Sequence, residues 1–147
     1  MRYTIRVSKA LLARADVEYI ALVADSLIPR FRDKILRDGG LAAALARIAA
    51  QLVYRIASER YRDSGKEIRF QMELADWEWE SLSAHRRDII REIESTIDYY
   101  RGIYDRARCR RCVAGRIAAL TVFKEIVEQI VRGDTRTSAA ELALEPA

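Results

Sequence analysis

The chain has 147 residues, half of them hydrophobic and a third charged, with a net charge of +4. This size suits one domain with a core, and charges interrupt the apolar runs too soon for a membrane span or a secretory signal. Six glycines and two prolines beside abundant Ala, Leu, Ile, Arg and Glu predict an all-α fold.

We expect a single helical domain over residues 1–147, organised as a bundle of long helices. Its segments are a basic arm (1–7), a helix hairpin (8–63), a linker with an acidic tryptophan segment (64–80), long helices (81–133) and a C-terminal tail (134–147).

Residues 1–7 alternate basic or polar side chains with apolar ones, which predicts an extended basic arm. Ser8 suits the N-cap of a helix that runs to about Leu27. This helix is apolar on nearly every side, so in so short a chain we expect partner subunits to complete its burial. The residues expected at that interface are Leu12, Tyr19, Leu22 and Val23.

Pro29 kinks or restarts this helix, and a basic cluster follows it. The cluster consists of Arg30, Arg32, Lys34 and Arg37. Asp38-Gly39-Gly40 predicts a turn before a second helix from Leu41 to Asp63. The two helices form a hairpin, but it lacks the recognition helix of a compact DNA-reading motif.

One side of the predicted helix from Leu41 to Asp63 carries arginines and no acid. At about 100° per residue, this side collects Arg47, Gln51, Tyr54, Arg55, Ser58, Tyr61 and Arg62. Guanidinium groups match phosphate oxygens, and no carboxylate on this face competes for them. The face therefore indicates contact with a phosphate backbone, and a solvated amphipathic face is the alternative.

Residues 68–72 alternate apolar and polar side chains, which indicates a short strand or an extended linker. Trp77 and Trp79 follow among acidic residues, where they serve an interface or the domain core. A third long helix is expected from near Ser83, with Ile89, Ile93 and Ile97 on its apolar stripe.

Residues 101–116 carry six arginines that would point in almost every direction if the segment were helical. Such a segment must be solvated or lie between anionic surfaces, and it forms one helix or two. Leu120, Phe123, Val127 and Ile130 mark a last long helix. Gly133-Asp134 should end it, and a capping box at Ser138 and Glu141 predicts a short terminal helix.

The charge is unevenly distributed along the chain. Residues 1–70 carry +6 and residues 101–116 carry +5, whereas residues 71–100 carry −5 and residues 117–147 carry −2. This pattern fits a nucleic-acid surface with a self-association surface, and charge alternation on helices is the alternative. Arginine outnumbers lysine 22 to 4, which suits phosphate binding but also reflects some GC-rich or thermophilic genomes.

Cys109 and Cys112 form the only CxxC pair, and His85 is the only histidine. A zinc site would need ligands from a second subunit, a disulfide would fit a hyperthermophile, and a packing or partner contact is the favoured alternative. The sequence has no glycine-rich phosphate loop, nucleophile–base pair or metal-ligand spacing. We therefore predict no enzymatic activity, no catalytic residue, no metal and no cofactor.

The basic arm, the arginine-rich helix hairpin and the unusually apolar helices resemble the major capsid proteins of filamentous archaeal viruses. The nearest members are those of tristromaviruses, with rudiviruses and lipothrixviruses as relatives. The resemblance covers the architecture of most of the chain and includes no diagnostic motif. Neither the cysteine pair nor the WEWE segment matches a feature of that family.

The resemblance implies a capsid subunit that dimerises with itself or with a paralogous subunit and wraps linear double-stranded DNA in a filament. It also implies a location in the virion, assembled in the host cytoplasm, with an outer lipid envelope as a further partner. The hairpin arginines would face the DNA, and residues 101–116 would form a second strip. With the polar residues of the arginine face, the expected DNA contacts are Arg30, Arg32, Arg37, Arg47, Gln51, Arg55, Ser58, Arg62, Arg101, Arg108, Arg111 and Arg116.

The sequence thus favours a structural protein that coats DNA through sequence-independent phosphate contacts. The alternative is a soluble helical protein–protein interaction module or regulator that uses Trp77, Trp79 and the acidic block. A sequence-specific transcription factor is a third, weaker alternative.

Overall fold

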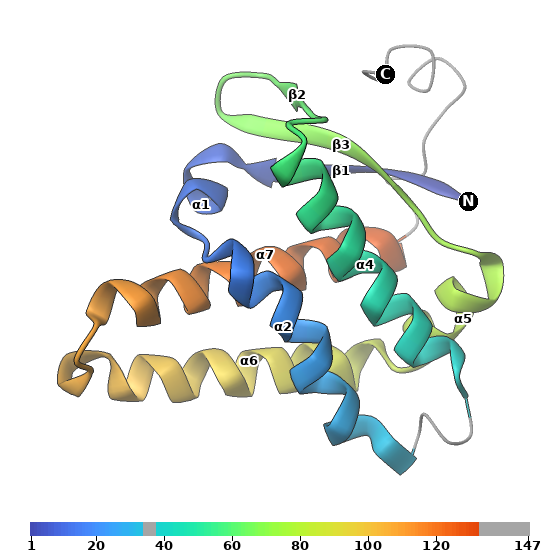
Figure 1. Cartoon of the computed structure of the whole chain (residues 1–147). Helices are drawn as coiled ribbons and strands as arrows, with labels where there is room; N and C mark the ends of the chain where they lie inside the picture. Colours follow the sequence, from blue (N-terminus) through green and yellow to red (C-terminus); the bar gives the residue numbers. More distant parts are fainter. Residues whose placement is uncertain (34–37, 133–147) are drawn as a thin grey trace.

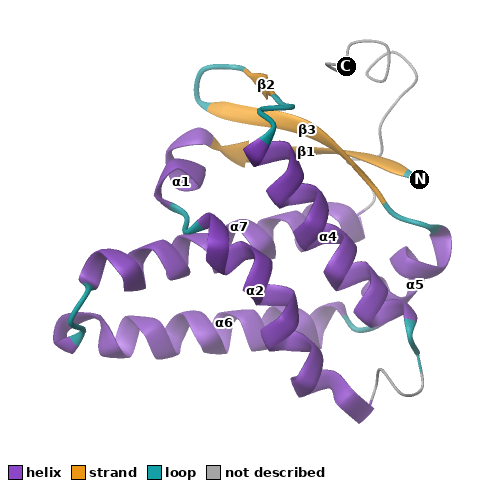
Figure 2. Cartoon of the chain, in the orientation of Figure 1, coloured by secondary structure: helices purple, strands orange, loops and turns teal. Residues whose placement is uncertain are grey.

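The computed structural model describes residues 1–33 and 38–132, which are mostly helical with a small antiparallel sheet (Figures 1 and 2). The α-helices of this part are α1 (Lys9–Arg14), α2 (Val17–Leu27), α4 (Gly40–Ala57), α5 (Asp76–Ala84), α6 (Arg86–Ile103) and α7 (Arg110–Arg132). The strands are β1 (Arg2–Ser8), β2 (Arg62–Asp63) and β3 (Glu67–Glu73), and the 3₁₀ turns are η1 (Ile28–Phe31) and η2 (Tyr104–Arg106). The helical prediction is confirmed in outline, but the chain is not all-α. Arg37, Lys34 and the predicted tail with its terminal helix lie outside the described residues.

The N-terminal residues form a strand of the core instead of a basic arm. β1 pairs with β3 along its full length, and the sheet order is β1-β3-β2. The register brings together three apolar pairs, Tyr3–Met72, Ile5–Phe70 and Val7–Ile68. All six of these side chains are buried. The alternation in residues 1–7 is therefore that of a strand with one buried face, and it needs β3 as its partner.

Two glutamine side chains on helices complete the hydrogen bonding of the strand backbone. In α7, the Gln129 amide accepts the N–H of Arg6 at 3.0 Å and donates to the Arg6 carbonyl at 2.8 Å. In α4, the Gln51 amide accepts the N–H of Glu73 at 2.7 Å and donates to the Glu73 carbonyl at 2.8 Å. Strand-edge backbone groups need such partners, and these bonds join α7 and α4 to the sheet.

The predicted helix from Ser8 to Leu27 is two helices. Ser8 caps α1 as predicted, since its hydroxyl accepts the N–H of Leu11 at 3.3 Å. Asp16 then caps α2 through the N–H of Tyr19 at 3.2 Å, and its own N–H donates to the Gly115 carbonyl of α7 at 3.0 Å. A Cβ on Gly115 would lie 3.3 Å from the Asp16 Cβ. Glycine at position 115 of α7 therefore permits the close approach of Asp16, the residue at which the predicted helix from Ser8 to Leu27 is interrupted.

The apolar surface of α2 is covered mainly by the same chain. α2 packs on α4 and α7 (Figure 1), and Ile20, Val23 and Leu27 are buried. Leu22 differs, because 52% of its surface is exposed. The prediction that partner subunits must complete this helix is therefore wrong for most of its surface.

Within the described residues, α4 is the one helix long and apolar enough to span a membrane by length and composition. The sequence interpretation expected no such segment. In the fold, Leu41, Leu45, Ile48 and Leu52 of α4 are fully buried, and the helix packs on α2, α5 and β3. Its composition is accounted for by this core position.

Replacing Ile5 by alanine should lower the free energy of unfolding by about 2–5 kcal/mol, because the variant leaves a cavity in the core beside Phe70. The matched control is Arg6→Ala on the exposed face of the same strand, which should cost no more than about 0.5 kcal/mol. Urea denaturation measures both. Equally small effects would mean that residues 1–7 are an exposed arm after all.

Candidate nucleic-acid interface

Arginines are most concentrated where α6 turns into α7. α6 ends at Ile103, η2 follows, and α7 begins at Arg110, so residues 101–116 form two helix ends and a turn. Figure 1 shows this turn at one end of the α6–α7 pair, whereas α5 adjoins the other end. On one continuous helix, the six arginines of residues 101–116 would point in almost every direction. Because the segment forms two helix ends and a turn, these arginines instead spread over a tip surrounded by solvent.

We call this region the basic tip. It consists of Tyr99, Arg101, Tyr104, Arg106, Arg108, Arg110 and Arg111, all of which are exposed. An Asp98 carboxylate oxygen in α6 lies 3.8 Å from the Arg101 Nη1 atom. Asp105 is the acidic residue of the turn itself. Arg106, Arg108 and Arg111 form no ion pair with any side chain in the described part of the chain. Their charge is therefore available to an external anion.

Two tyrosines accompany these arginines on the surface. Tyr99 is 63% exposed and Tyr104 is 38% exposed. The Arg110 guanidinium lies 5.9 Å from the centre of the Tyr104 ring and donates to the Asp105 carbonyl at 2.9 Å. Arginines interleaved with exposed aromatic rings are typical of nucleic-acid surfaces. The site prediction omitted both tyrosines, although their position within the arginine-rich segment was a usable signal.

Arg116, a predicted DNA contact, belongs to a cluster that joins three helices. Its Nη1 donates to the Tyr100 hydroxyl at 3.0 Å, and its guanidinium lies 5.0 Å from the centre of the Tyr19 ring. Burial and the hydrogen bond to Tyr100 raise the pKa of Tyr19, and the hydrogen bond to Tyr100 raises the pKa of Arg116. Arg116 therefore ties α7 to α2 and α6, and is less available than the arginines of the tip.

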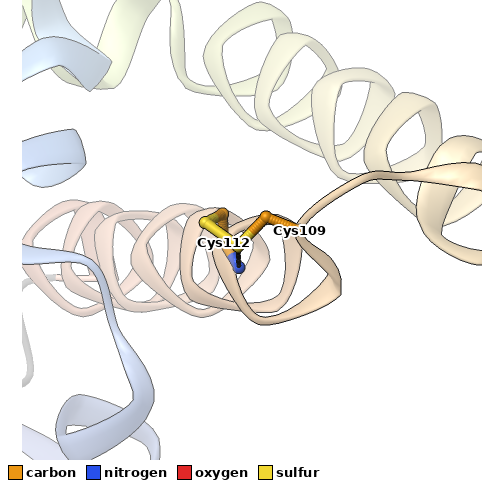
Figure 3. Close-up of a disulfide and its surroundings, with 2 residues drawn as sticks. All are labelled: Cys109 and Cys112. Atoms are coloured by element: carbon orange, nitrogen blue, oxygen red, sulfur yellow. Dashed lines mark hydrogen bonds between the residues drawn. A yellow bond between two sulfur atoms is a disulfide. The ribbon is translucent and has the colours of Figure 1, made fainter.

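Cys109 and Cys112 are joined by a disulfide at the start of α7 (Figure 3). The structure thus selects the disulfide from the alternatives that the sequence left open. Both cysteines are exposed, and the Cys109 sulfur accepts the backbone N–H of Cys112 at 3.1 Å. No group of three or more His, Cys, Asp or Glu residues suited to a metal occurs within residues 1–33 and 38–132.

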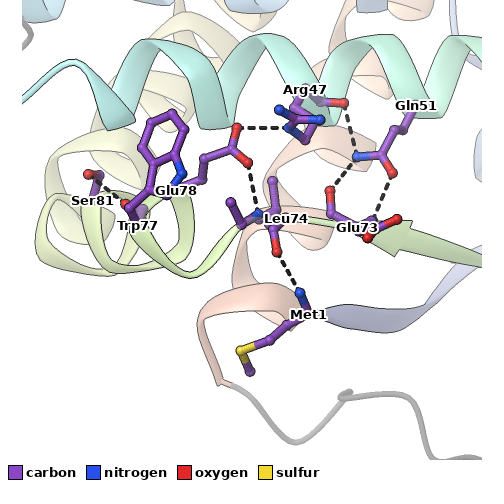
Figure 4. A network of polar contacts seen from close by, with 9 residues as sticks. Met1, Arg47, Gln51, Glu73, Leu74, Trp77, Glu78 and Ser81 are labelled. Carbon is purple, nitrogen blue, oxygen red and sulfur yellow. Dashed lines mark hydrogen bonds and ion pairs between the residues drawn. The ribbon is translucent and has the colours of Figure 1, made fainter.

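The predicted arginine face of residues 41–63 is not a continuous helical face. α4 ends at Ala57, Glu59 has a positive φ of 53°, and Arg62 lies in β2. Arg47 donates through Nε to the carboxylate of Glu78 at 2.8 Å, and this carboxylate is fully buried (Figure 4). The prediction that no acid competes for the face is wrong, because α5 supplies Glu78 from 31 residues further along the chain.

The other polar residues of that face also make internal contacts. Gln51 binds the backbone of Glu73 (Figure 4). Arg55 donates to the carbonyl of Arg60 at 3.2 Å, and the Ser58 hydroxyl donates to the carbonyl of Tyr54. The polar residues on this face of α4 therefore bind α5, the end of β3 and the turn that follows α4.

The basic cluster after Pro29 is partly neutralised. Arg30 pairs with Glu92 of α6 at 2.7 Å and donates to Thr96 at 3.2 Å. Arg32 is exposed and lines an open hollow with Asp88 and Arg91. The two described arginines of this cluster, Arg30 and Arg32, therefore have more acids close by than the arginines of the basic tip.

The predicted interface residues fall into two groups. Tyr19 and Val23 are buried, and Leu12 and Trp79 pack against the core. The Trp79 ring N–H donates to the Ile130 carbonyl at 2.9 Å, so the core alternative applies to this tryptophan. Leu22 is 52% exposed and Trp77 is 55% exposed, so only these two remain available to a partner.

Comparison with known proteins adds no relative. No family model matches the chain, and no match was found among curated proteins or solved structures. The candidate nucleic-acid interface is therefore inferred from the geometry of the described residues.

Replacing Arg47 by alanine should lower the free energy of unfolding by about 1–3 kcal/mol, because the buried Glu78 carboxylate loses a charged hydrogen-bond partner. The control Arg87→Ala removes the same charge from an exposed position and should change stability by less than about 0.5 kcal/mol. Urea unfolding compares the two variants. Equal effects would show that Arg47 has no structural role and is free for an external ligand.

Proposed function

We propose that this protein is a non-enzymatic structural protein that binds the phosphate backbone of double-stranded DNA and assembles along it. The resemblance described above suggests the setting, a capsid subunit of a filamentous virion. The observation that carries the DNA-binding part is the basic tip, with five exposed arginines and two exposed tyrosines around one turn.

The chemistry of the tip suits the phosphate backbone of DNA. Each guanidinium presents a planar fork that pairs with two phosphate oxygens, and several forks on one convex turn can follow neighbouring phosphates. Binding of this kind releases counterions and reads no bases. A protein that coats DNA needs that tolerance of sequence, because every part of the molecule must be covered.

Assembly along DNA also requires contacts between copies of the chain. Leu22 and Trp77 are the large apolar residues among the predicted interface set that remain exposed. Exposed aromatic side chains beside polar residues often anchor such contacts. The proposal assigns Trp77 to the contact between subunits, which can be the same chain or a paralogous one.

The position of Trp77 also supports a second candidate function, a protein–protein interaction module without a DNA role. Trp77 lies between the exposed acids Asp76 and Glu80 on one turn of α5, and such a surface suits a basic protein partner. The two functions differ in their oligomeric state. A small oligomer that forms without DNA and ignores DNA favours the module.

The double variant Arg108→Gln/Arg111→Gln should weaken binding to random double-stranded DNA by roughly tenfold at low salt and lower the slope of log K against log salt by about 1.8. The reason is the loss of two phosphate contacts. Fluorescence anisotropy across a salt series measures both quantities.

The matched control is Arg86→Gln/Arg87→Gln, which removes the same charge from the other end of α6. Equal losses in the two variants would show that only net charge matters and that the tip is no site. Absence of binding by the unaltered chain at low salt would overturn the DNA proposal, and strong preference for one site would indicate a sequence-specific regulator.

Replacing Trp77 by alanine should leave affinity for a short duplex unchanged but remove cooperative binding to long DNA, because the contact between copies is lost. Binding isotherms on duplexes of two lengths, with electron microscopy of the long complexes, measure this effect. Unchanged cooperativity would exclude Trp77 from the contact between subunits. Dissociation of a DNA-independent oligomer by the same variant would favour the interaction module.

A further inference from the structure

We propose that Cys109 and Cys112 form a redox-active site that exchanges with anionic thiols of the glutathione type. The inference stands on the disulfide and its surroundings, and it does not depend on DNA binding. It assigns a chemical activity to the CxxC pair, which the proposed coating function leaves unused.

The disulfide is accessible, and the fold does not depend on it. Both cysteines are exposed and only three positions apart. Closing so short a loop restricts the unfolded chain little in comparison with a long loop. Another contact holds this end of α7, namely the bond from the Asp16 N–H to the Gly115 carbonyl at 3.0 Å. The disulfide can therefore open while the fold persists.

The surroundings of the pair stabilise a thiolate. In the sequence, Arg110 and Arg111 lie between the two cysteines and Arg108 directly precedes Cys109, so each of these three positive charges is borne by a residue adjacent to a cysteine. The pair also lies at the N-terminus of the 23-residue helix α7, where the helix dipole favours negative charge. Since the Cys109 sulfur already accepts the Cys112 N–H at 3.1 Å, Cys109 is the sulfur best placed to leave as a thiolate.

The exchange proceeds in two balanced steps. A glutathione thiolate attacks the Cys112 sulfur, a bond forms between these two sulfurs, and the electron pair of the broken disulfide passes to Cys109. A second glutathione thiolate then attacks the glutathione sulfur of the mixed disulfide, which releases Cys112 as a thiolate and yields oxidised glutathione. Two electrons pass from two glutathione molecules to the cysteine pair, and solvent supplies protons to the thiolates. In reverse, the dithiol reduces a disulfide of the same class.

The charge of the basic tip determines which thiols react. Glutathione carries net negative charge at neutral pH, so the arginines raise its local concentration at the disulfide. The reacting thiolate form of cysteamine carries a positive amino group that cancels its negative charge, so it gains no such attraction. An electrostatic preference of this kind should decline as salt screens the tip.

The test is reduction of the air-oxidised full chain by glutathione or cysteamine at equal thiolate concentration. Alkylation of the released thiols followed by mass spectrometry gives the rates. We expect glutathione to react roughly tenfold faster at low salt, with a smaller difference at high salt, and far-ultraviolet circular dichroism should show a retained fold after reduction. Arg108→Gln/Arg111→Gln should reduce the preference several-fold, whereas Arg86→Gln/Arg87→Gln should retain it.

Three results would overturn the inference. Cysteines that stay reduced in air would show that the pair does not form the disulfide. A disulfide that resists both thiols until denaturant is added would show a structural bond. Equal rates for the two thiols at low salt would show that the arginines select nothing.

Discussion

The need to satisfy the backbone groups of a small sheet organises this molecule. β1 is an edge strand, and Gln129 of α7 supplies the two hydrogen bonds that Arg6 lacks on that side. Gln51 of α4 does the same for Glu73 at the end of β3. Because strand-edge backbone groups need hydrogen-bond partners, these contacts join α7 and α4 to the sheet. The helices α1, α2, α5 and α6 each pack against α4 or α7.

This arrangement divides the arginines into two classes. Those near the centre of the fold, such as Arg47 and Arg116, hold helices together through Glu78 and the paired tyrosines. Those at the far end of α6 and α7 have few acids nearby and face solvent. Gln129 lies near the C-terminal end of α7 and binds the sheet, whereas the N-terminal end of α7 carries the turn at the other end of the helix (Figure 1).

The disulfide lies at the same end of α7, and this brings two chemistries into one place. Three of the arginines that would attract phosphates, Arg108, Arg110 and Arg111, are sequence neighbours of the cysteines. Opening the disulfide would leave one or two negative charges among these arginines, and those charges would compete with an external anion. Redox state and anion binding would therefore influence each other at the basic tip, even though each proposal stands on its own observations.

The sequence by itself determined the helical composition, the Ser8 cap, the interruption at Pro29 and the apolar face of α7, whereas it left residues 68–72 open as a short strand or an extended linker. These features depend on local periodicity and capping, which neighbouring residues specify. Only the tertiary structure decided that residues 1–7 are a core strand, because alternation alone does not show whether a partner strand exists. It likewise decided that Arg47 forms an ion pair with Glu78 and that Gln51 binds the backbone of Glu73, since these partners lie 31 and 22 residues away in the sequence. Periodicity shows which residues share one face of a helix. The hydrogen-bond and ion-pair partners of those residues come from elements distant in the chain.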